Sequence, residues 1–373
     1  MSCHSDSTTA TAKYHQDLKH KYFVFAGLVT VTLLLGIYAI SKGSYHLSIS
    51  HVIQVLIGNA EGNSHLVVWN IRMPRIASAV ISGWGLALSG LIIQSLLRNP
   101  LGSPSTLGIS QGAAFGAVVG IILFDLGGSG SEITFGTEKA SGMLKLVKMI
   151  FSGNMAHLYS VTTFAFAGAM AATWVILILA KLKRLSTEAI ILAGVALSSL
   201  FSSATVLIQY FATESQIASA LFWTFGDVAR SSWREIGIMA LIIIAASVWA
   251  TLNRWNFNSL LSGEEAAKGL GVSVESLRIK GMVIAAVVSA VITSFHGVIA
   301  FVGLLAPHIA KRIVGSDHRL AIPVSCAVGG GLLLMADTAG RLFIGSGNLP
   351  VGILTSFMGA PMFLYLLMRG VKR

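Results

Sequence analysis

Charged residues are scarce in this chain. Asp, Glu, Lys and Arg make up only 11% of its 373 residues, whereas hydrophobic residues make up 54%, and the mean hydropathy is +0.77. A soluble protein of this length needs far more charge to cover its surface. The composition therefore predicts a protein whose solvent is largely lipid.

Residues that carry chemistry are also few. The two cysteines, Cys3 and Cys326, show no metal-ligand spacing and suggest no disulfide framework. The sequence has no paired-carboxylate site, no metal-spaced His cluster, no nucleophile elbow and no phosphate-cradling loop of the Gly-x4-Gly-Lys-Ser/Thr kind. These absences predict a protein that is not an enzyme, holds no cofactor or metal, and cannot bind and split ATP by itself.

What the chain has in abundance is long apolar stretches. About 20 apolar residues cross a bilayer as a helix, because lipid cannot satisfy bare backbone groups. The sequence predicts an all-α polytopic membrane protein with ten spans. These lie near 22–41, 75–97, 106–124, 160–180, 188–210, 234–252, 277–296, 299–314, 320–343 and 351–369. Residues 22–373 then form one membrane domain, preceded by a polar tail over residues 1–21 that does not resemble a cleaved signal peptide.

Basic residues set the orientation, since Lys and Arg gather in cytoplasmic loops. With the N-terminus inside, the inner loops and tails hold most of them: Lys13, Lys19, Lys21, Lys181, Lys183, Arg184, Arg254, Lys268, Arg278, Lys280, Lys311, Arg312, Arg319, Arg369, Lys372 and Arg373. An even span count places both termini in the cytoplasm of a multi-pass inner-membrane protein. The net charge of +11 then needs no nucleic-acid partner to explain it.

Small residues recur at helical spacing on two of the predicted spans. Gly108, Gly112, Gly116 and Gly120 follow one another every fourth residue. Gly83, Ala87 and Gly90 do the same on the preceding span. Such faces let helix backbones approach closely in lipid, so we interpret them as packing surfaces.

Two loops stand out. Residues 125–158 form an outer insertion, in which Met143 to Phe151 (MLKLVKMIF) fits either an amphipathic helix at the interface or a plain surface loop. Residues 253–276 form an inner loop, in which Ser262 can cap a short helix, Glu264 and Glu265 favour its first turn, and Gly269 or Gly271 can end it. Such a helix suits docking of a soluble partner, although an ordinary connection stays open.

The placement of ionisable residues bears on the class of transporter. Secondary transporters usually bury such groups at mid-membrane to couple protons or sodium. Here Glu188, Glu214, Asp227, His296 and Asp337 all lie near predicted span ends. This argues against ion coupling, while a secondary transporter or channel without an ATPase remains the alternative.

Motifs along nearly the whole chain resemble the FecCD/BtuC-type permeases of type II ATP-binding-cassette importers for iron-siderophores, haem and cobalamin. The matching segments, in order, are Arg72-Met73-Pro74-Arg75, Asn99-Pro100-Leu101-Gly102, Leu185-Ser186-Thr187, Gly263-Glu264-Glu265-Ala266-Ala267, Pro307-His308-Ile309, Asp317-His318-Arg319, Ala336-Asp337 with Arg341, and Leu349-Pro350-Val351-Gly352. The chain departs from the family pattern at Asn348, where a Glu is usual, and in the length of residues 125–158.

The resemblance implies a fold of ten helices per chain, with two permease copies forming one pathway. It implies two copies of a separate ATP-binding subunit, which hold ATP and Mg, and a periplasmic or lipid-anchored substrate-binding protein. An iron(III)-siderophore is the first expectation for the cargo, followed by haem, cobalamin and an oxyanion such as molybdate.

The resemblance also implies roles for residues at the matching positions. The ATPase-coupling residues are Gly263, Glu264, Glu265, Ala266, Lys268, Gly269 and Gly271. The cytoplasmic gate is Leu185, Ser186 and Thr187, and the structural turns are Asn99, Pro100, Pro307 and His308.

Three arginines lie at predicted outer span ends, against the charge rule: Arg72, Arg75 and Arg341. The resemblance implies that they receive acidic residues of the binding protein, which suits the planar donor fork of arginine. The alternative is interfacial snorkelling, with Arg341 paired to Asp337 one helical turn earlier.

Overall fold

The computed structural model describes residues 3–42, 47–58, 63–124, 154–182, 187–343 and 349–370, and all regular secondary structure within them is helical. The helices are α1 (Cys3–Ser41), α2 (Ile49–Leu56), α3 (Asn63–Leu66), the π-helical turn η1 (Val67–Arg72), α4 (Met73–Leu96), α5 (Ile109–Val118), the π-helical turn η2 (Val119–Leu123), α7 (Asn154–Leu182), α8 (Thr187–Tyr210), α9 (Glu214–Thr224), the 3-10 turn η3 (Val228–Arg230), α10 (Trp233–Leu252), α11 (Arg254–Leu261), α12 (Glu264–Gly269), α13 (Val274–His296), α14 (Val302–Val314), α15 (His318–Phe343) and α16 (Val351–Gly370).

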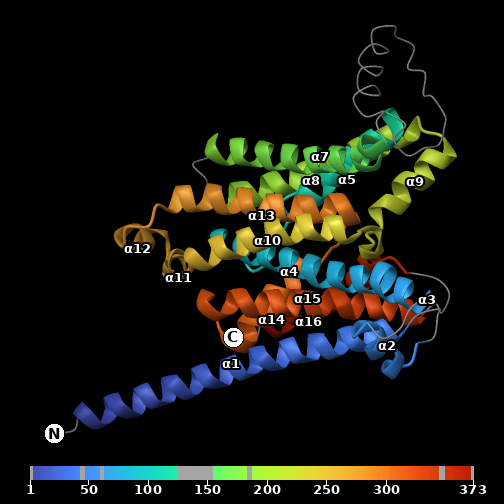
Figure 1. The fold of residues 1–373 in the computed structure, drawn as a ribbon. Helices are drawn as coiled ribbons and strands as arrows, with labels where there is room; N and C mark the ends of the chain where they lie inside the picture. Colours follow the sequence, from blue (N-terminus) through green and yellow to red (C-terminus); the bar gives the residue numbers. More distant parts are fainter. Residues whose placement is uncertain are drawn as a thin grey trace.

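The long helices run roughly side by side, so the bundle has two ends (Figure 1). One end carries α11, α12 and the N-terminus, and is called the α12 end below. The other carries α2, α3 and α9, and is called the α9 end. All segments that the sequence predicts as inner loops and that the structure describes lie at the α12 end.

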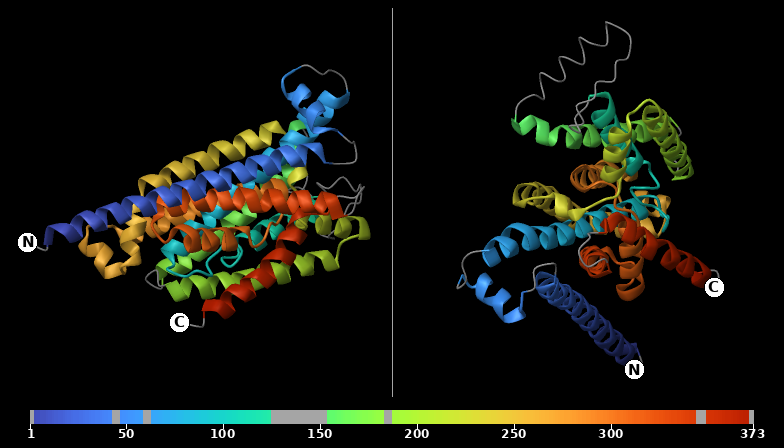
Figure 2. Two further views of the ribbon diagram at one scale, coloured as in Figure 1. Left: turned by 90° about the horizontal axis from the view of Figure 1, so that it is seen from below. Right: turned by 90° about the vertical axis from the view of Figure 1, so that its right-hand side faces the viewer.

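Burial separates central helices from peripheral ones. In the most apolar part of the α4 span 78% of residues are buried, and in α15 72%, whereas in α1 the share is 11% and in α8 17%. Looking along the bundle, Figure 2 (right) shows α1 at the periphery. Helices α4 and α15 therefore form the core against which the others pack.

Seven helices are long and apolar enough to cross a membrane, counted over the described residues, and two shorter apolar helices cover Ile109–Leu123 and Val351–Tyr365. The span predicted over 299–314 corresponds to α14, which has only 13 residues. At 1.5 Å per residue it is about 20 Å long, too short to cross the hydrocarbon core alone. The prediction of an all-α polytopic membrane protein is confirmed. The span predicted over 299–314 is helical only from Val302.

The polar N-terminal segment is continuous with the first span. Helix α1 begins at Cys3 and runs unbroken to Ser41, while its span-like part begins at Gln16. The predicted boundary at residues 21 and 22 is therefore a change of composition within one helix. In Figure 2 (left) the N-terminal part of α1 extends beyond the rest of the bundle.

Glycine faces allow the closest helix contacts, as the spacing predicts. A Cβ atom added at Gly90 of α4 would lie 1.7 Å from the carbonyl oxygen of Gly303 in α14. One added at Gly83 would lie 2.2 Å from the carbonyl oxygen of Gly329 in α15. Gly112 of α5 faces Gly168 of α7 in the same way, at 2.6 Å. Only glycine fits at such backbone-to-backbone contacts.

Replacing Gly90 with alanine is expected to push α4 and α14 apart. Forcing a methyl group into a closed contact costs about 1–3 kcal/mol. Thermal unfolding in detergent, followed by size-exclusion chromatography, measures the loss. The matched control is Gly237→Ala on α10, where an added Cβ meets nothing within 4 Å. Equal melting temperatures for the two variants would contradict the close contact.

Candidate functional site

The predicted coupling segment forms a short helix at the α12 end. Helix α12 starts after Gly263, whose φ of +115° is a conformation that L side chains rarely adopt. It ends in a Schellman turn, in which the N–H of Gly271 donates to the carbonyl of Lys268 and that of Val272 to Ala267. The prediction that Ser262 caps this helix is wrong, because Ser262 is the C-cap of α11 and Gly263 is the N-cap of α12.

The two glutamates of α12 differ in their surroundings. Glu264 forms an ion pair with Arg278 of α13, whose side chain is 5% exposed. The side chain of Glu265 is 92% exposed and lies 3.3 Å from that of Lys268, a contact worth little at a surface. Ala267 is buried, whereas Ala266, Lys268, Gly269 and Gly271 are exposed. The helix is thus pinned by one glutamate and presents the other to solvent.

The remaining predicted residues at this end are only partly described. Of the predicted gate, Leu185 and Ser186 lie outside the described residues, and Thr187 is the first residue of α8. Asn99 does form a turn after α4, since its side chain accepts a hydrogen bond of 2.8 Å from the N–H of Leu101 beyond Pro100. Residues 125–153 of the predicted insertion, and Asn348, also lie outside the described residues.

Pro307 and His308 are not in a turn, and that prediction is wrong. Both lie inside α14, which begins later than the sequence suggests because the chain is non-helical from Gly297 to Phe301. Phe301, directly before α14, has a left-handed backbone with φ of +65°. The chain thus turns before the helix and not at its Pro-His pair.

The three predicted arginines lie at the α9 end, where two of them, Arg75 and Arg341, contact the carboxylate of Asp337. Arg75 lies 2.9 Å (Nε) and 2.8 Å (Nη2) from Oδ1 of Asp337, and Nε of Arg341 lies 3.2 Å from Oδ2. The side chains of Arg75 and Asp337 are buried, and that of Arg341 is 9% exposed. The sequence-level alternative, a pair between Arg341 and Asp337, is therefore present in the structure, and Arg75 joins it.

Two of these arginines also hold the end of α1. Arg341 donates to the carbonyl oxygen of Ala39 at 3.2 Å, and Arg72 donates to that of Ile40. Carbonyl groups at the end of a helix have no partner within the helix, and cationic donors stabilise them. The arginine cluster (Arg72, Arg75, Arg341 and Asp337) thus joins α1, α4 and α15.

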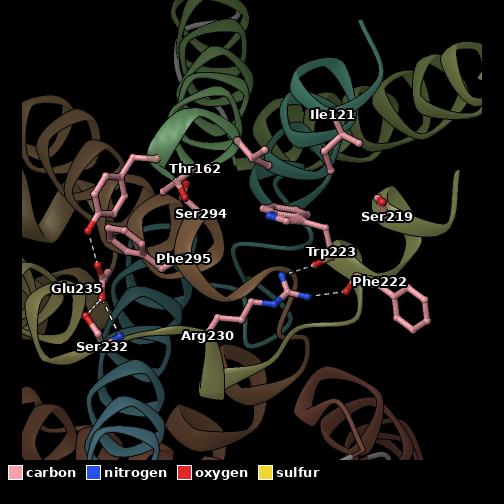
Figure 3. A pocket seen from close by; sticks show the side chains of 12 residues that line it. Ile121, Thr162, Ser219, Phe222, Trp223, Arg230, Ser232, Glu235, Ser294 and Phe295 are labelled. Carbon is pink, nitrogen blue, oxygen red and sulfur yellow. Dashed lines mark hydrogen bonds between the residues drawn. The ribbon is translucent and has the colours of Figure 1, made fainter. Parts of the chain in front are cut away.

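A pocket of about 520 Å³ opens at the same end, between the starts of α7 and α10, the end of α13, and α9 (Figure 3). Arg230 donates to the carbonyl oxygens of Phe222 (2.6 Å) and Trp223 (3.1 Å) at the end of α9. Glu235 accepts from the N–H of Ser232 at 2.7 Å and from the hydroxyl of Tyr159. The guanidinium of Arg230 therefore binds the end of α9, and the carboxylate of Glu235 binds the start of α10 and Tyr159. Aromatic rings form the rest of the pocket wall.

Sequence reasoning missed the contacts between distant segments. Asp337 and Arg75 are 262 positions apart in the sequence. The ring of the buried His296 lies 2.6 Å from the hydroxyl of Ser78, 218 positions away, and 3.0 Å from that of Ser231, 65 positions away. The capping box at Ser232 and Glu235 is a local signal in the pocket wall that the sequence does contain.

The comparison with protein families is decisive, because the model of the FecCD transport family matches residues 31–369. The chain belongs to this family. An ABC transporter permease of Methanocaldococcus jannaschii, whose name specifies no substrate, is 48% identical over 95% of this chain and 96% of its own length. The hemin transport permease of Yersinia pestis is 30% identical over 92% and 94%.

Structural similarity agrees with FecCD membership. A solved metal-chelate-type ABC transporter in an inward-facing conformation superposes with a TM-score of 0.76, at 27% identity, over 93% of this chain and 99% of that one. Other relatives are named for cobalamin, Fe(3+)-citrate or molybdate import. Substrates thus differ within the family.

FecCD membership settles several expectations. The chain is a multi-pass membrane permease of an ABC importer with the type II permease fold. Permeases of this family are not enzymes and bind no cofactor, because a separate subunit hydrolyses ATP. The importer therefore includes an ATPase and a binding protein as partners.

Proposed function

We propose that this permease moves an iron(III)-siderophore or a related metal chelate, such as haem or cobalamin, across the cytoplasmic membrane. The observation that carries the proposal is the family match over residues 31–369, together with relatives named for these cargoes. An oxyanion is the second candidate, because a molybdate import permease of Haemophilus influenzae is 31% identical over 93% of this chain.

Uptake by the complete importer tests the cargo. The permease, its ATP-binding subunit and its binding protein would be reconstituted in proteoliposomes and supplied with labelled ferric hydroxamate, ferric citrate, haem, cobalamin and molybdate in turn. One chelate is expected to accumulate only with ATP. ATP-dependent accumulation of molybdate alone would replace the first proposal with the second, and uptake without any ATPase would contradict both.

The proposed assembly has two permease copies, two ATP-binding subunits and one binding protein, with residues 22–373 as the membrane domain. The second copy is proposed from the similarity to the FecCD family. Exposed apolar side chains on α8 and α16, including Leu192, Leu207 and Phe357, are open to lipid or to such a copy. The exposed face of α12 supports contact with an ATP-binding subunit, and Leu185, Ser186 and Thr187 remain the proposed gate.

The α12 end is proposed to face the cytoplasm, with both termini on that side. Nine basic residues that the structure describes lie at or near this end, in the turn after α4 and on α7, α11, α12, α13, α14 and α15: Arg98, Lys181, Arg254, Lys268, Arg278, Lys280, Lys311, Arg312 and Arg319. Such an excess is typical of cytoplasmic loops.

Cysteine labelling in intact cells checks this orientation. In a background with Cys3→Ser and Cys326→Ser, a cysteine at Ser131 is expected to react with an impermeant thiol reagent added outside. A cysteine at Glu265, on the exposed face of α12, should react only after the membrane is opened. The opposite pattern would reverse the topology.

Arg72, Arg75 and Arg341 are proposed to attract acidic residues of the binding protein to the α9 end. Three guanidinium groups and one carboxylate leave this cluster with a net charge of +2 (three positive, one negative). These side chains have little exposure and already bind Asp337 and the end of α1. Their contribution to docking is therefore chiefly a long-range attraction, which sets how fast the binding protein meets the permease and in which register.

A further inference from the structure

Helix α11, which leads into α12, is tied to two membrane helices by a hydrogen-bond relay made by the partly buried Asn258 and the buried His318 and Ser95. The side-chain oxygen of Asn258 lies 2.9 Å from the backbone nitrogen of His318 and 2.8 Å from its ring Nδ1. The other ring nitrogen lies 2.7 Å from the hydroxyl oxygen of Ser95, near the end of α4. Three segments that are far apart in sequence thus meet at one imidazole.

The direction of these bonds is fixed by their partners. The amide nitrogen of Asn258 donates to the carboxylate of Asp317 at 2.8 Å, and a carboxylate only accepts. The amide oxygen therefore faces His318, whose Nδ1 must carry a hydrogen, and in the neutral ring Nε2 is an acceptor. The hydroxyl of Ser95 has one hydrogen to donate. Its oxygen lies 2.7 Å from Nε2 and 2.7 Å from the carbonyl oxygen of Leu91 in the same helix, so these two acceptors share that hydrogen. Burial acts to raise the pKa of Asp317, but hydrogen bonds from the backbone of Arg319 and from Asn258 hold that pKa below its ordinary value.

Packing makes the relay rigid. His318 is 1% exposed and Ser95 5% exposed. The ring of Phe257, the residue before Asn258, stacks on the imidazole with centroids 5.4 Å apart and planes 26° apart. Asn258, at the other end of the relay, is partly buried. At the buried imidazole, breaking a hydrogen bond leaves a polar group away from water, so the bonds to His318 favour one arrangement.

We propose that Asn258, His318 and Ser95 are positioning residues that carry a displacement of α12 to α15 and α4, the two most buried long helices. The inference rests on the proposed role of α12 as the ATPase contact. The Glu264–Arg278 pair anchors α12 to α13, and the relay is a second attachment that reaches the centre of the bundle. Coupling between distant sites is carried by such packed, hydrogen-bonded elements that move together.

Distance measurements on the complete transporter test whether the elements move together. In the background without cysteines, spin labels at the exposed Leu261 on α11 and at the exposed Arg319 on α15 report their separation with and without ATP and vanadate. With the relay intact this separation is expected to stay constant. In Asn258→Ala it should change on trapping, because α11 is no longer bound to α15.

Transport stoichiometry gives the second readout, with the chelate that the wild-type importer accumulates in the panel above. Asn258→Ala is expected to raise the ATP hydrolysed per chelate imported about tenfold, equivalent to about 1.4 kcal/mol. Ser95→Ala, which removes only a hydroxyl, should act in the same direction and carries the test if Asn258→Ala folds poorly. The matched control is Asn256→Ala, since the side chain of Asn256 donates to that of Asn253, the residue directly before α11, and reaches no other helix of the relay.

The outcomes separate the relay from the function it rests on. If Asn258→Ala and Ser95→Ala keep both the wild-type stoichiometry and a constant label separation, the relay inference is wrong while the importer stands. If the wild-type complex accumulates none of the chelates despite hydrolysing ATP, the proposed function fails, and the label separation still decides whether α11 and α15 move together.

Discussion

Replacing Asp337 with alanine is expected to cost about 3–5 kcal/mol of stability, since removing one partner of a buried ion pair leaves an uncompensated charge. The Asp337 side chain is 0% exposed, and those of Arg75 and Arg341 are 8% and 9% exposed. Without the carboxylate, two buried guanidinium groups face each other. Thermal unfolding in detergent measures the loss, with Glu188→Ala on the exposed first turn of α8 as control.

An apolar replacement of the pair separates folding from docking. Asp337→Leu combined with Arg75→Met and Arg341→Met removes the buried charges together, and such replacements are often neutral for stability. This variant is expected to fold better than Asp337→Ala. If it also binds the binding protein as tightly as wild type at low and high salt, the arginine cluster serves only the fold.

Charge reversal on α12 should strongly reduce import, for a different reason at each glutamate. Glu265→Lys alters a solvent-exposed side chain with only a weak partner, so loss of uptake would report on contact with the ATP-binding subunit. Glu264→Lys places a second cation beside Arg278 and should detach α12 from α13. Both variants are expected to lower ATP-driven uptake by at least about tenfold, or about 1.4 kcal/mol in coupling free energy.

Copurification distinguishes the two glutamates. Glu265→Lys should weaken binding of the ATP-binding subunit, whereas Glu264→Lys should retain binding but hydrolyse ATP without import. Replacing Gly269, which is exposed on α12, with Trp is expected to resemble Glu265→Lys. Glu214→Lys at the α9 end is the control. Normal uptake by both α12 variants at normal expression would remove α12 from the coupling path.

The sequence predicts the fold well wherever the signal is local. Apolar length marks the spans, the four-residue glycine spacing marks the α5 face that meets α7, and Glu-Glu before Gly-x-Gly marks α12. It fails at α14, because hydropathy rises at residue 299 but the backbone becomes helical only after the left-handed turn at Phe301. Apolar composition does not distinguish a helix from a non-helical segment buried among helices.

For the candidate sites too, contacts between residues close in sequence can be predicted and contacts between distant residues cannot. Arg341 and Asp337 are one helical turn apart, so their pairing can be predicted from spacing. Arg75 joins them from 262 positions away, and His318 reaches Ser95 across 223 positions. No periodicity in the chain encodes such contacts, because they depend on which helices become neighbours. Single polar residues within apolar spans indicate that partners exist, without indicating which.

The fastening of α1 has a consequence for the order in which the protein is made. Helix α1 leaves the ribosome first, and the other helices of the bundle bury little of it. The hydrogen bond from Arg341 to the carbonyl oxygen of Ala39 can form only after about 300 further residues have been synthesised. Helix α15, against which α1 packs, is also synthesised near the end of the chain. At about 5–20 residues per second, α1 spends many seconds in the bilayer without these contacts. In a chain truncated before α15, α1 should therefore remain accessible to proteases or membrane chaperones. In the complete chain, the contacts with α15 should protect it.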